Sequence, residues 1–173
     1  MKTCLPTLKI VTLTTLTLLF TGCLGYQLGG PTPDQIKTIA LAPIINRTTE
    51  PAIEQPLTHA MRSFIQQDGR LALTDTTQAD AILEITLTRH QSHPIAYRSN
   101  QRDVVPRYYR QTLTATAQLR NTQTGDIISQ TTNHGESLFE FTSDLSTSKR
   151  NTHTAAADEL ARLLFSDLIE IWP

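Results

Sequence analysis

The stretch YRQTLTATAQLRNTQTGDII, residues 109–128, decides the fold, because apolar and polar side chains alternate along most of it. The apolar positions are Tyr109, Leu113, Ala115, Ala117 and Leu119, and the polar positions opposite them are Thr112, Thr114, Thr116 and Gln118. This alternation predicts a strand over Tyr108–Arg120 with one buried face and one solvated face. The turn residues Asn121–Asp126 predict a hairpin into a second strand at Ile127–Thr132. The sheet is therefore expected to be covered on one side only.

Three segments upstream extend the predicted sheet. Ala81–Arg89 alternates in the same way, and Pro94 is expected to break or bend its continuation. Ile36–Ile45 carries apolar side chains on both faces, which predicts a central strand whose regular pairing ends at Pro43. Leu71–Thr74 predicts a short strand.

An apolar stripe between these strands predicts a helix at about residues 52–67. Its members recur at the spacing of one helix face: Leu57, Ala60, Met61, Phe64 and Ile65. Thr49 is a candidate N-cap, and Gly69 fits the C-terminal stop. We interpret the stripe as core packing rather than as a groove for a partner helix.

A second apolar stripe predicts a helix over Thr154–Trp172, whereas residues 133–152 show weak periodicity and are expected to be a mobile connection. Together these elements predict an α+β fold. The expected architecture is a two-layer sandwich, with two helices packed on one face of a mostly antiparallel or mixed sheet. We expect one such domain, over residues 36–173.

The composition excludes several classes of protein. The formal charge of −1 gives no basic footprint for nucleic acid. Two cysteines cannot build a disulfide-dense scaffold or a four-cysteine zinc site. Threonine, which is β-branched, occurs 28 times and favours a sheet-rich fold.

The first 23 residues predict export and lipidation. Lys2 and Lys9 open a basic start, and the apolar stretch that follows them is too short to span a membrane. It ends in Phe20-Thr21-Gly22-Cys23, which resembles a bacterial lipobox, although leucine is more usual where Phe20 stands. We predict a cleaved lipoprotein signal peptide over residues 1–22, N-acyl and S-diacylglycerol chains on Cys23, and a tether over residues 23–35. The alternative is an ordinary export signal with a chance cysteine.

Two consequences follow if this processing occurs. The mature chain then carries a net charge of −3 and no free thiol, which excludes thiol catalysis and cysteine metal ligation. Leu24, rather than aspartate, follows the cysteine, and this favours the outer membrane over retention in the inner membrane.

Catalytic signatures are missing from the sequence. It contains no GxSxG, P-loop, HExxH or GxGxxG motif. His90 and His93 have H-x-x-H spacing, but residues three apart in a strand face opposite sides, so shared metal binding would need a bend. Asp75, Asp80 and Glu84 are interpreted as turn and solvent residues. We therefore predict no enzyme, no catalytic residue, no metal and no further cofactor, with a periplasmic hydrolase using the two histidines as an alternative.

Between Tyr97 and Arg110 the chain carries a cluster of cations and tyrosines with Asp103 as its only acid. The cations are Arg98, Arg102, Arg107 and Arg110. Arginine pairs bidentately with phosphate, and tyrosine suits a boundary between apolar and polar surroundings. The cluster would suit an anionic lipid such as lipopolysaccharide. The alternative is a solvated hairpin edge whose charges discourage sheet-to-sheet pairing.

The order of segments resembles the LptE-type lipopolysaccharide-assembly lipoproteins, in the divergent branch outside the enteric bacteria. The matching pieces are CLGYQLGG at 23–30, IKTIALAPIINRTTEP at 36–51, QQDGRLAL at 66–73, ADAILEITLT at 79–88, residues 109–128, and LARLL at 160–164. Departures are Leu24, Phe20, Gln111 and Thr114. The resemblance covers nearly all of the mature chain, and the order of the pieces is more specific than any one of them.

This resemblance implies a function that the residues alone do not. Its members act as plug and assembly partner of an LptD-type outer-membrane β-barrel, and they bind lipopolysaccharide. The chain would then be lipid-anchored at the outer membrane, with its body in the periplasm or in the barrel lumen, and would have no nucleic-acid partner. The alternative is another adaptor lipoprotein, such as a cell-wall-synthase activator or a secretion accessory.

Overall fold

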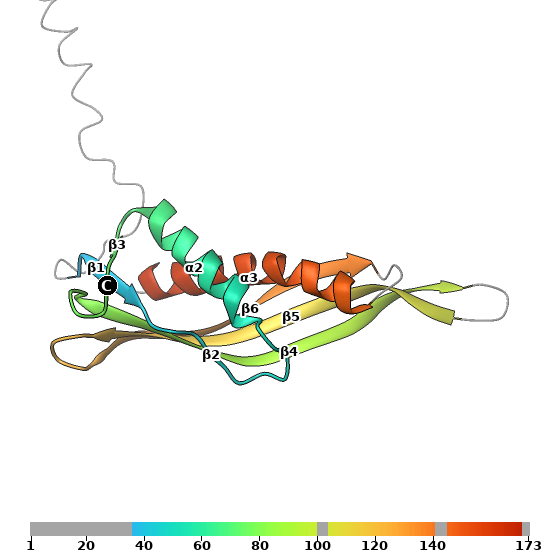
Figure 1. The fold of residues 1–173 in the computed structure, drawn as a ribbon, viewed down its shortest axis with the longest axis horizontal. Coiled ribbons are helices and arrows are strands. Elements are labelled where there is room, and N and C mark those ends of the chain that lie inside the picture. Colours follow the sequence, from blue (N-terminus) through green and yellow to red (C-terminus); the bar gives the residue numbers. More distant parts are fainter. Residues whose placement is uncertain (1–35, 100–103, 141–144, 171–173) are drawn as a thin grey trace, which may run out of the picture. The chain divides into compact units, whose positions relative to one another are not determined.

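The structure, a computed structural model, describes residues 36–99, 104–140 and 145–170. In these residues two helices lie on one face of a six-stranded mixed sheet, which confirms the predicted α+β class (Figure 1). The elements in chain order are β1 (Thr38–Leu41), β2 (Ile45–Asn46), α2 (Glu54–Asp68), β3 (Ala72–Leu73), β4 (Ala81–Ser99), β5 (Val104–Asn121), β6 (Ile127–Glu140) and α3 (Leu145–Glu170).

Three long antiparallel strands form most of the sheet. The strand order is β3-β1-β4-β5-β6, and β2 pairs with β4 beyond the end of β1. β1 runs parallel to both of its neighbours, whereas β4, β5 and β6 are antiparallel in turn. The hairpin between β5 and β6 lies where the sequence predicts it, with Gly125 at a positive φ of 77° in its turn.

The predicted strand at Ile36–Ile45 is divided into β1 and β2, with Pro43 between them. Pro43 ends the regular pairing as expected, and both pieces remain parallel to β4. The division leaves this margin of the sheet built from strands of two to four residues.

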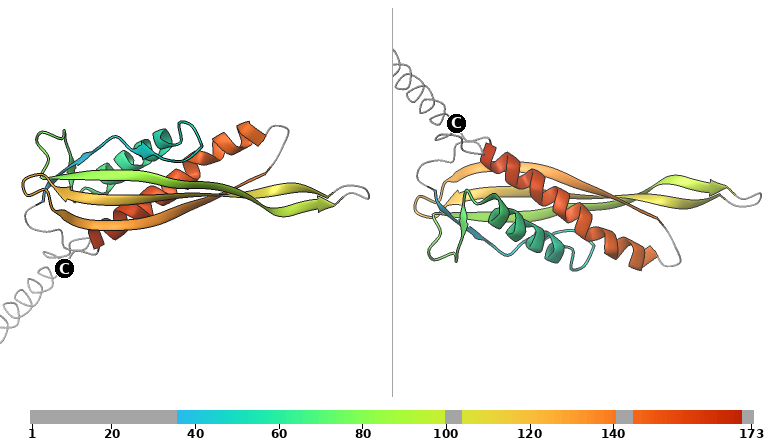
Figure 2. Two further views of the ribbon diagram at one scale, coloured as in Figure 1. Left: turned by 90° about the horizontal axis from the view of Figure 1, so that it is seen from below. Right: turned by 90° about the horizontal axis from the view of Figure 1, so that it is seen from above.

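The core lies between the sheet and the two helices. Leu83, Ile85 and Leu87 of β4 point into it, as do the alternating residues of β5 from Leu113 to Leu119. The stripe of α2 is buried as predicted, with Phe64 at its margin, and α3 contributes Ala156, Ala157, Leu160, Ala161, Leu164 and Leu168. Figure 2 shows α3 crossing the sheet diagonally beside the shorter α2.

Pro94 does not end β4, because the strand continues to Ser99 and pairs there with the start of β5. The register shifts between Pro94 and Ala96 and between Ala96 and Tyr97 agree with the predicted bend. β2 pairs with β4 only as far as Leu87, so beyond that point the described residues give β4 a partner on one side only. A proline is tolerated in such an edge strand, since no second neighbour requires its missing N–H. The two strands extend past the helices as a hairpin arm (Figure 1).

The prediction of a mobile connection over residues 133–152 is wrong for 133–140 and 145–152, and residues 141–144 lie outside the described residues. β6 continues through it to Glu140, and α3 already begins at Leu145. The inward positions of this part of β6 include Asn133, Gly135 and Ser137 rather than large apolar residues, which hides the alternation. A Cβ built on Gly135 would lie 2.1 Å from the carbonyl oxygen of Ala156, so close packing of α3 requires glycine there.

The ends of α2 agree in part with the prediction. Gly69 ends the helix in the left-handed conformation at a φ of 71°, as expected. Thr49 is not the N-cap, because the helix begins at Glu54 and Ile53 occupies the cap position without a side-chain hydrogen bond. Ala52, at a φ of 60°, turns the chain into the helix.

Several predicted features lie outside the described residues. They are the signal peptide at 1–22, the lipidation site Cys23, the tether at 23–35, and Arg102. Of the helices in the described part of the chain, none is both long and apolar enough to cross a bilayer.

Candidate functional site

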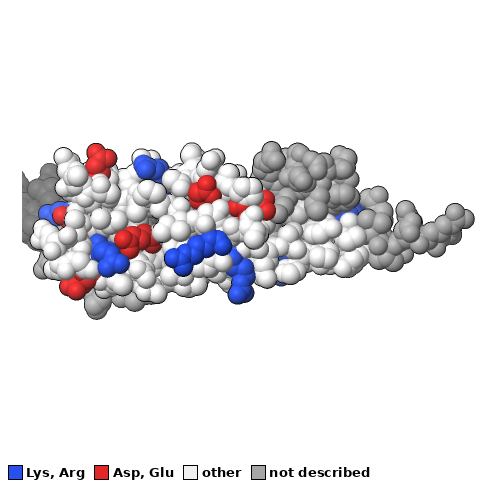
Figure 3. Space-filling model, turned by 60° about the horizontal axis from the view of Figure 1, so that its bottom comes forward, with Lys and Arg blue, Asp and Glu red and all other residues white. Residues whose placement is uncertain are grey.

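No described element covers the sheet face opposite the helices (Figure 2), and paired polar side chains line this open face. Rows of side chains contact one another across β5 and β6: the hydroxyls of Thr116 and Thr132 lie 3.0 Å apart, and Gln118 donates to Gln130 at 3.0 Å. Figure 3 shows this side of the molecule, with separate charged groups among mostly uncharged side chains. The threonines that the sequence placed on a polar face therefore form a broad, nearly neutral surface.

Arg107 and Arg110, two of the four predicted lipid contacts, lie on β5 at one end of this surface. Each faces an acid of β6: Arg107 donates to Glu140 at 2.8 Å, and Arg110 lies 3.5 Å from Glu136. The hydrogen bond from Arg107 to Glu140, aided by that residue's negative charge, raises the pKa of the guanidinium above its ordinary value. All four side chains remain roughly half exposed.

These ion pairs change the meaning of the predicted arginine cluster. Sequence reasoning found one acid near it, because it treated residues 133–152 as a connection and missed that Glu136 and Glu140 lie on the next strand. Each described cation of the cluster is locally neutralised by an acid. Arg98 lies on β4, beyond the residues whose side chains the structure describes. Its part in the cluster therefore stays a prediction.

Exposed apolar side chains adjoin these arginines. Leu138, which is 61% exposed, is the register partner of Arg110, and Ile95 and Tyr97 are 44% and 56% exposed on the nearby arm. Tyr109 stacks on Phe139 with ring centroids 5.3 Å apart, but this pair lies on the helix side of the sheet, where Phe139 is only 6% exposed. This end therefore combines cations with apolar surface, the pairing that an amphiphilic anion requires.

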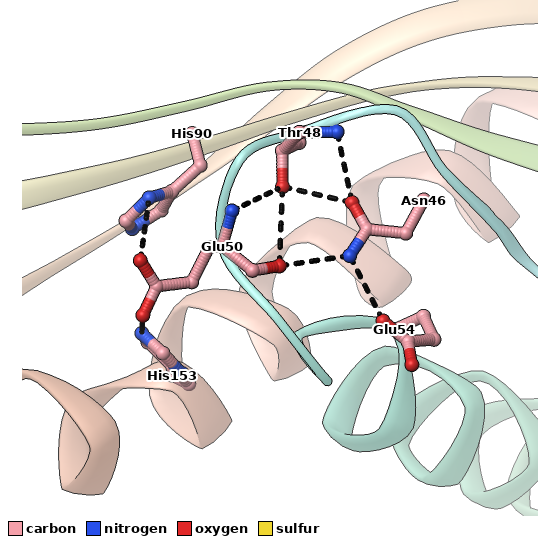
Figure 4. A network of polar contacts seen from close by, with 6 residues as sticks. All are labelled: Asn46, Thr48, Glu50, Glu54, His90 and His153. Carbon is pink, nitrogen blue, oxygen red and sulfur yellow. Dashed lines mark hydrogen bonds and ion pairs between the residues drawn. The ribbon is translucent and has the colours of Figure 1, made fainter.

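A network of polar contacts organises the loop between β2 and α2 (Figure 4). The side-chain amide of Asn46 donates to the carbonyl oxygen of Glu50 at 2.8 Å and to the carboxylate of Glu54 at 3.0 Å. The Thr48 hydroxyl donates to the side-chain oxygen Oδ1 of Asn46 at 2.8 Å and accepts the Glu50 N–H at 3.2 Å. The Asn-Arg-Thr sequence at 46–48 thus serves as a turn.

Glu50 extends this network to the buried histidines (Figure 4). Its two carboxylate oxygens each lie 3.7 Å from a ring nitrogen, one of His90 on β4 and one of His153 on α3. The two imidazole rings meet edge to face with centroids 5.6 Å apart. His93 is exposed, as the strand geometry predicts, so His90 and His93 are not brought together.

The geometry of this cluster favours a structural role. It joins the loop, the sheet and α3, and its contacts of 3.7 Å are longer than hydrogen bonds. Within the ranges that the structure describes, no group of three or more histidine, cysteine, aspartate or glutamate side chains is placed to hold a metal ion.

Asp80 also has a role that sequence reasoning missed. Its carboxylate accepts the N–H groups of Lys37 and Thr38 and the Thr38 hydroxyl, at 2.8 to 2.9 Å, and so joins the start of β1 to the start of β4. The Lys37 N–H and then the two Thr38 groups lower the pKa of this carboxyl below its ordinary value. The interpretation of Asp80 as a turn and solvent residue is therefore wrong. We call these contacts of Asp80 with Lys37 and Thr38 the clasp, and it cannot be seen in the sequence, because its residues lie about forty positions apart.

The family model described as "LptE: Lipopolysaccharide-assembly" matches residues 36–170, which include all the elements described above.

The chain belongs to the LptE family.

At the level of the family it is a lipopolysaccharide-assembly lipoprotein, and LptE proteins are non-enzymatic lipoproteins of the outer membrane. No curated protein sequence matches the chain.

Solved structures share the fold at low sequence identity. Protein XCC0632 from Xanthomonas campestris has a TM-score of 0.53 and 13% identity, over 82% of this chain and 90% of that one. A homologue of the neuraminyllactose-binding hemagglutinin from Helicobacter pylori has a TM-score of 0.50 and 11% identity, over 80% and 89% of the two chains. At such identity these likenesses concern the fold alone.

Proposed function

We propose that this LptE protein is the plug and assembly partner of an LptD-type outer-membrane β-barrel, and that its open sheet face lies against the barrel wall. The observation that carries the proposal is the uncovered surface of paired threonine and glutamine side chains across β5 and β6. The lumen of an outer-membrane barrel is polar, so a neutral hydrogen-bonding face suits it better than an apolar or strongly charged face. The lipobox supports anchoring through lipid chains on Cys23.

Affinity purification from solubilised outer membranes tests the barrel partnership. A C-terminally tagged chain should recover one large barrel protein. The double variant Thr116→Arg, Thr132→Arg should reduce that recovery, because two bulky charges would stand on the open face. Gln66→Arg, an exposed position on α2, is the matched control and should leave recovery unchanged. Repeated recovery of a peptidoglycan synthase or a secretion channel without a barrel would contradict the proposal and favour the adaptor alternative.

We further propose that lipopolysaccharide contacts the end of the sheet that carries Arg107 and Arg110. The support is the combination of two arginines with the exposed side chains of Leu138, Ile95 and Tyr97. A lipid phosphate would replace Glu140 and Glu136 as partner of the arginines, while acyl chains would cover the apolar side chains. Arg98 and Arg102 belong to this proposal on sequence grounds alone.

Two double variants that remove charge test this contact, and they should change the affinity for lipopolysaccharide in opposite directions. Arg107→Gln with Arg110→Gln should weaken binding to purified lipopolysaccharide. Glu136→Gln with Glu140→Gln should strengthen it, because the arginines lose their competing acids. Arg62→Gln, on the exposed side of α2, controls for the loss of one positive charge elsewhere. Equal binding by all variants would leave the arginines as ordinary partners of the β6 acids.

A further inference from the structure

The two edges of the sheet differ in the length of the strands that form them. One margin consists of β3, β1 and β2, which have two, four and two residues, and Pro43 lies between β1 and β2. The other margin is β6, a single strand of 14 residues that, among the described strands, pairs with β5 alone. Its pairing has one irregularity, near Ile127, and is continuous from Ser129 to Glu140.

The direction of the main-chain groups of β6 is fixed by one hydrogen bond. The N–H of Glu136 donates to the carboxylate of Glu159 on α3 at 2.6 Å, so it points away from β5. Main-chain groups in an antiparallel strand alternate between the two sides. The outward residues are therefore Gln130, Thr132, His134, Glu136, Leu138 and Glu140.

β6 has few of the features that normally protect an edge strand. The sequence IISQTTNHGESLFE contains no lysine, arginine or proline, and its regular part contains no bulge. Natural edge strands commonly carry such features, because unpaired main-chain groups recruit other strands. The long regular edge of β6 thus resembles a pairing surface rather than a protected margin.

The charges beside this edge select the kind of strand that can join it. Two carboxylates of α3 contact β6 on its helix side: Glu159 binds the Glu136 N–H, and Asp167 accepts hydrogen bonds from Thr131 and Asn133. Pairing between two copies of β6 would bring these acids of both copies together. A segment with lysine or arginine at alternate positions would instead place its cations beside them.

We propose that β6 is a docking edge for an extended basic segment of a partner protein, which adds to the sheet as its next strand. In the absence of that strand, the Glu159 carboxylate accepts the Glu136 N–H that the strand would otherwise bind. When the segment pairs, its carbonyl group takes over this N–H, and the freed Glu159 carboxylate contacts a lysine or arginine of the segment. The inference goes beyond the barrel partnership and does not depend on it.

A defined peptide tests the proposal on the full-length lipidated protein in detergent. The probe is a blocked ten-residue peptide of alternating lysine and threonine, and its counterpart alternates glutamate and threonine. The basic peptide should slow amide exchange at Gln130, Thr132 and His134, whose N–H groups point away from β5. The amides between them, which already pair with β5, should keep their exchange rates. Equal binding of the acidic peptide, or unchanged exchange at the outward amides, would overturn the proposal. Protection that appears without peptide and rises with protein concentration would also overturn it, since a second copy would then be the occupant.

A proline variant separates main-chain pairing from side-chain contact. Thr132→Pro removes one outward N–H, whereas Thr132→Val removes the same hydroxyl and keeps the N–H. The proline variant should bind the basic peptide roughly five- to tenfold more weakly than the valine variant, the effect of about one hydrogen bond. Unchanged exchange of the β5 amides in both variants would show that the sheet is intact. Equal affinity of the two variants would contradict strand addition.

Discussion

The two faces of the sheet use the same strands for different purposes. On the helix side, alternate residues of β4 and β5 are almost completely buried, and α3 approaches β6 so closely that Gly135 admits no side chain. On the open side, the side chains between them are half-buried or exposed and pair with one another in rows. The covered face therefore provides most of the stability of the fold. The side chains of the open face contribute little to it and can instead suit a binding partner.

The largest expected effect is at Gly135 on the covered face. Gly135→Ala would place a Cβ 2.1 Å from the Ala156 carbonyl oxygen and 2.6 Å from the Leu160 nitrogen, so α3 must move. We expect a loss of about 3 kcal/mol or more in the free energy of unfolding, at the upper end of the cost of overpacking. His134→Ala, the next residue but on the open side, should change it by less than about 0.5 kcal/mol. Urea unfolding measures both, and similar losses would contradict the division.

A gain in stability is expected at Gln111, a polar residue among the buried apolar side chains of β5. Gln111 is fully buried, and neither atom of its side-chain amide has a hydrogen-bond partner among the described residues. Gln111→Met should raise the free energy of unfolding by about 1–3 kcal/mol, because it removes a buried unsatisfied group. Gln118→Met, which breaks the contact with Gln130 on the open face, should give no gain. Denaturant midpoints of the two variants check this, and a destabilised Gln111→Met would mean that the amide is needed there.

The clasp at Asp80 predicts how stability depends on pH. Its pKa is lowered in the folded protein, so its contribution is fully present above the unfolded value, near 3.8, and is lost as the pH falls through the folded value. The difference in unfolding free energy between the wild type and Asp80→Asn should be constant above about pH 5 and shrink below about pH 4. Urea titrations from pH 3 to 7 measure it. A difference that grows on acidification would contradict the lowered pKa.

The smallest effect on stability is expected for the open face. Thr116→Ala with Thr132→Ala removes one cross-strand contact, which is worth roughly 0.2–1 kcal/mol. Thermal unfolding should therefore change little, while the amount of barrel recovered by affinity purification should fall. A large loss of stability would mean that the open face supports the fold, and the division would then be wrong.

The sequence predicts the elements whose side chains alternate strongly, and it fails where packing requires small residues. The strands around Leu83 and Leu113 and the stop at Gly69 could be predicted, because their patterns are local. The second half of β6 could not, since its inward positions hold Gly135 and Ser137 to admit α3. The continuation of β4 through Pro94 depends on the absence of a second neighbour, which only the topology decides.

The candidate site shows the same limit. Arg107 and Arg110 are visible in the sequence as a cluster of cations, but their partners Glu136 and Glu140 lie about thirty residues later. The contacts of Glu50 with His90 and His153 likewise join three separate elements. No local pattern in the sequence shows which residues the strand register places opposite one another. The charge balance of a sheet can therefore be known only once the pairing of its strands is known.

Site-specific photo-cross-linking in intact cells tests most directly whether the open sheet face contacts the barrel. A photo-reactive residue at Thr116 probes that face, and one at Gln66 on α2 probes the exposed side of the helices. We predict that the residue at Thr116 cross-links efficiently to a large barrel protein and that the residue at Gln66 does so much less. Efficient cross-links from Gln66 with none from Thr116 would contradict it.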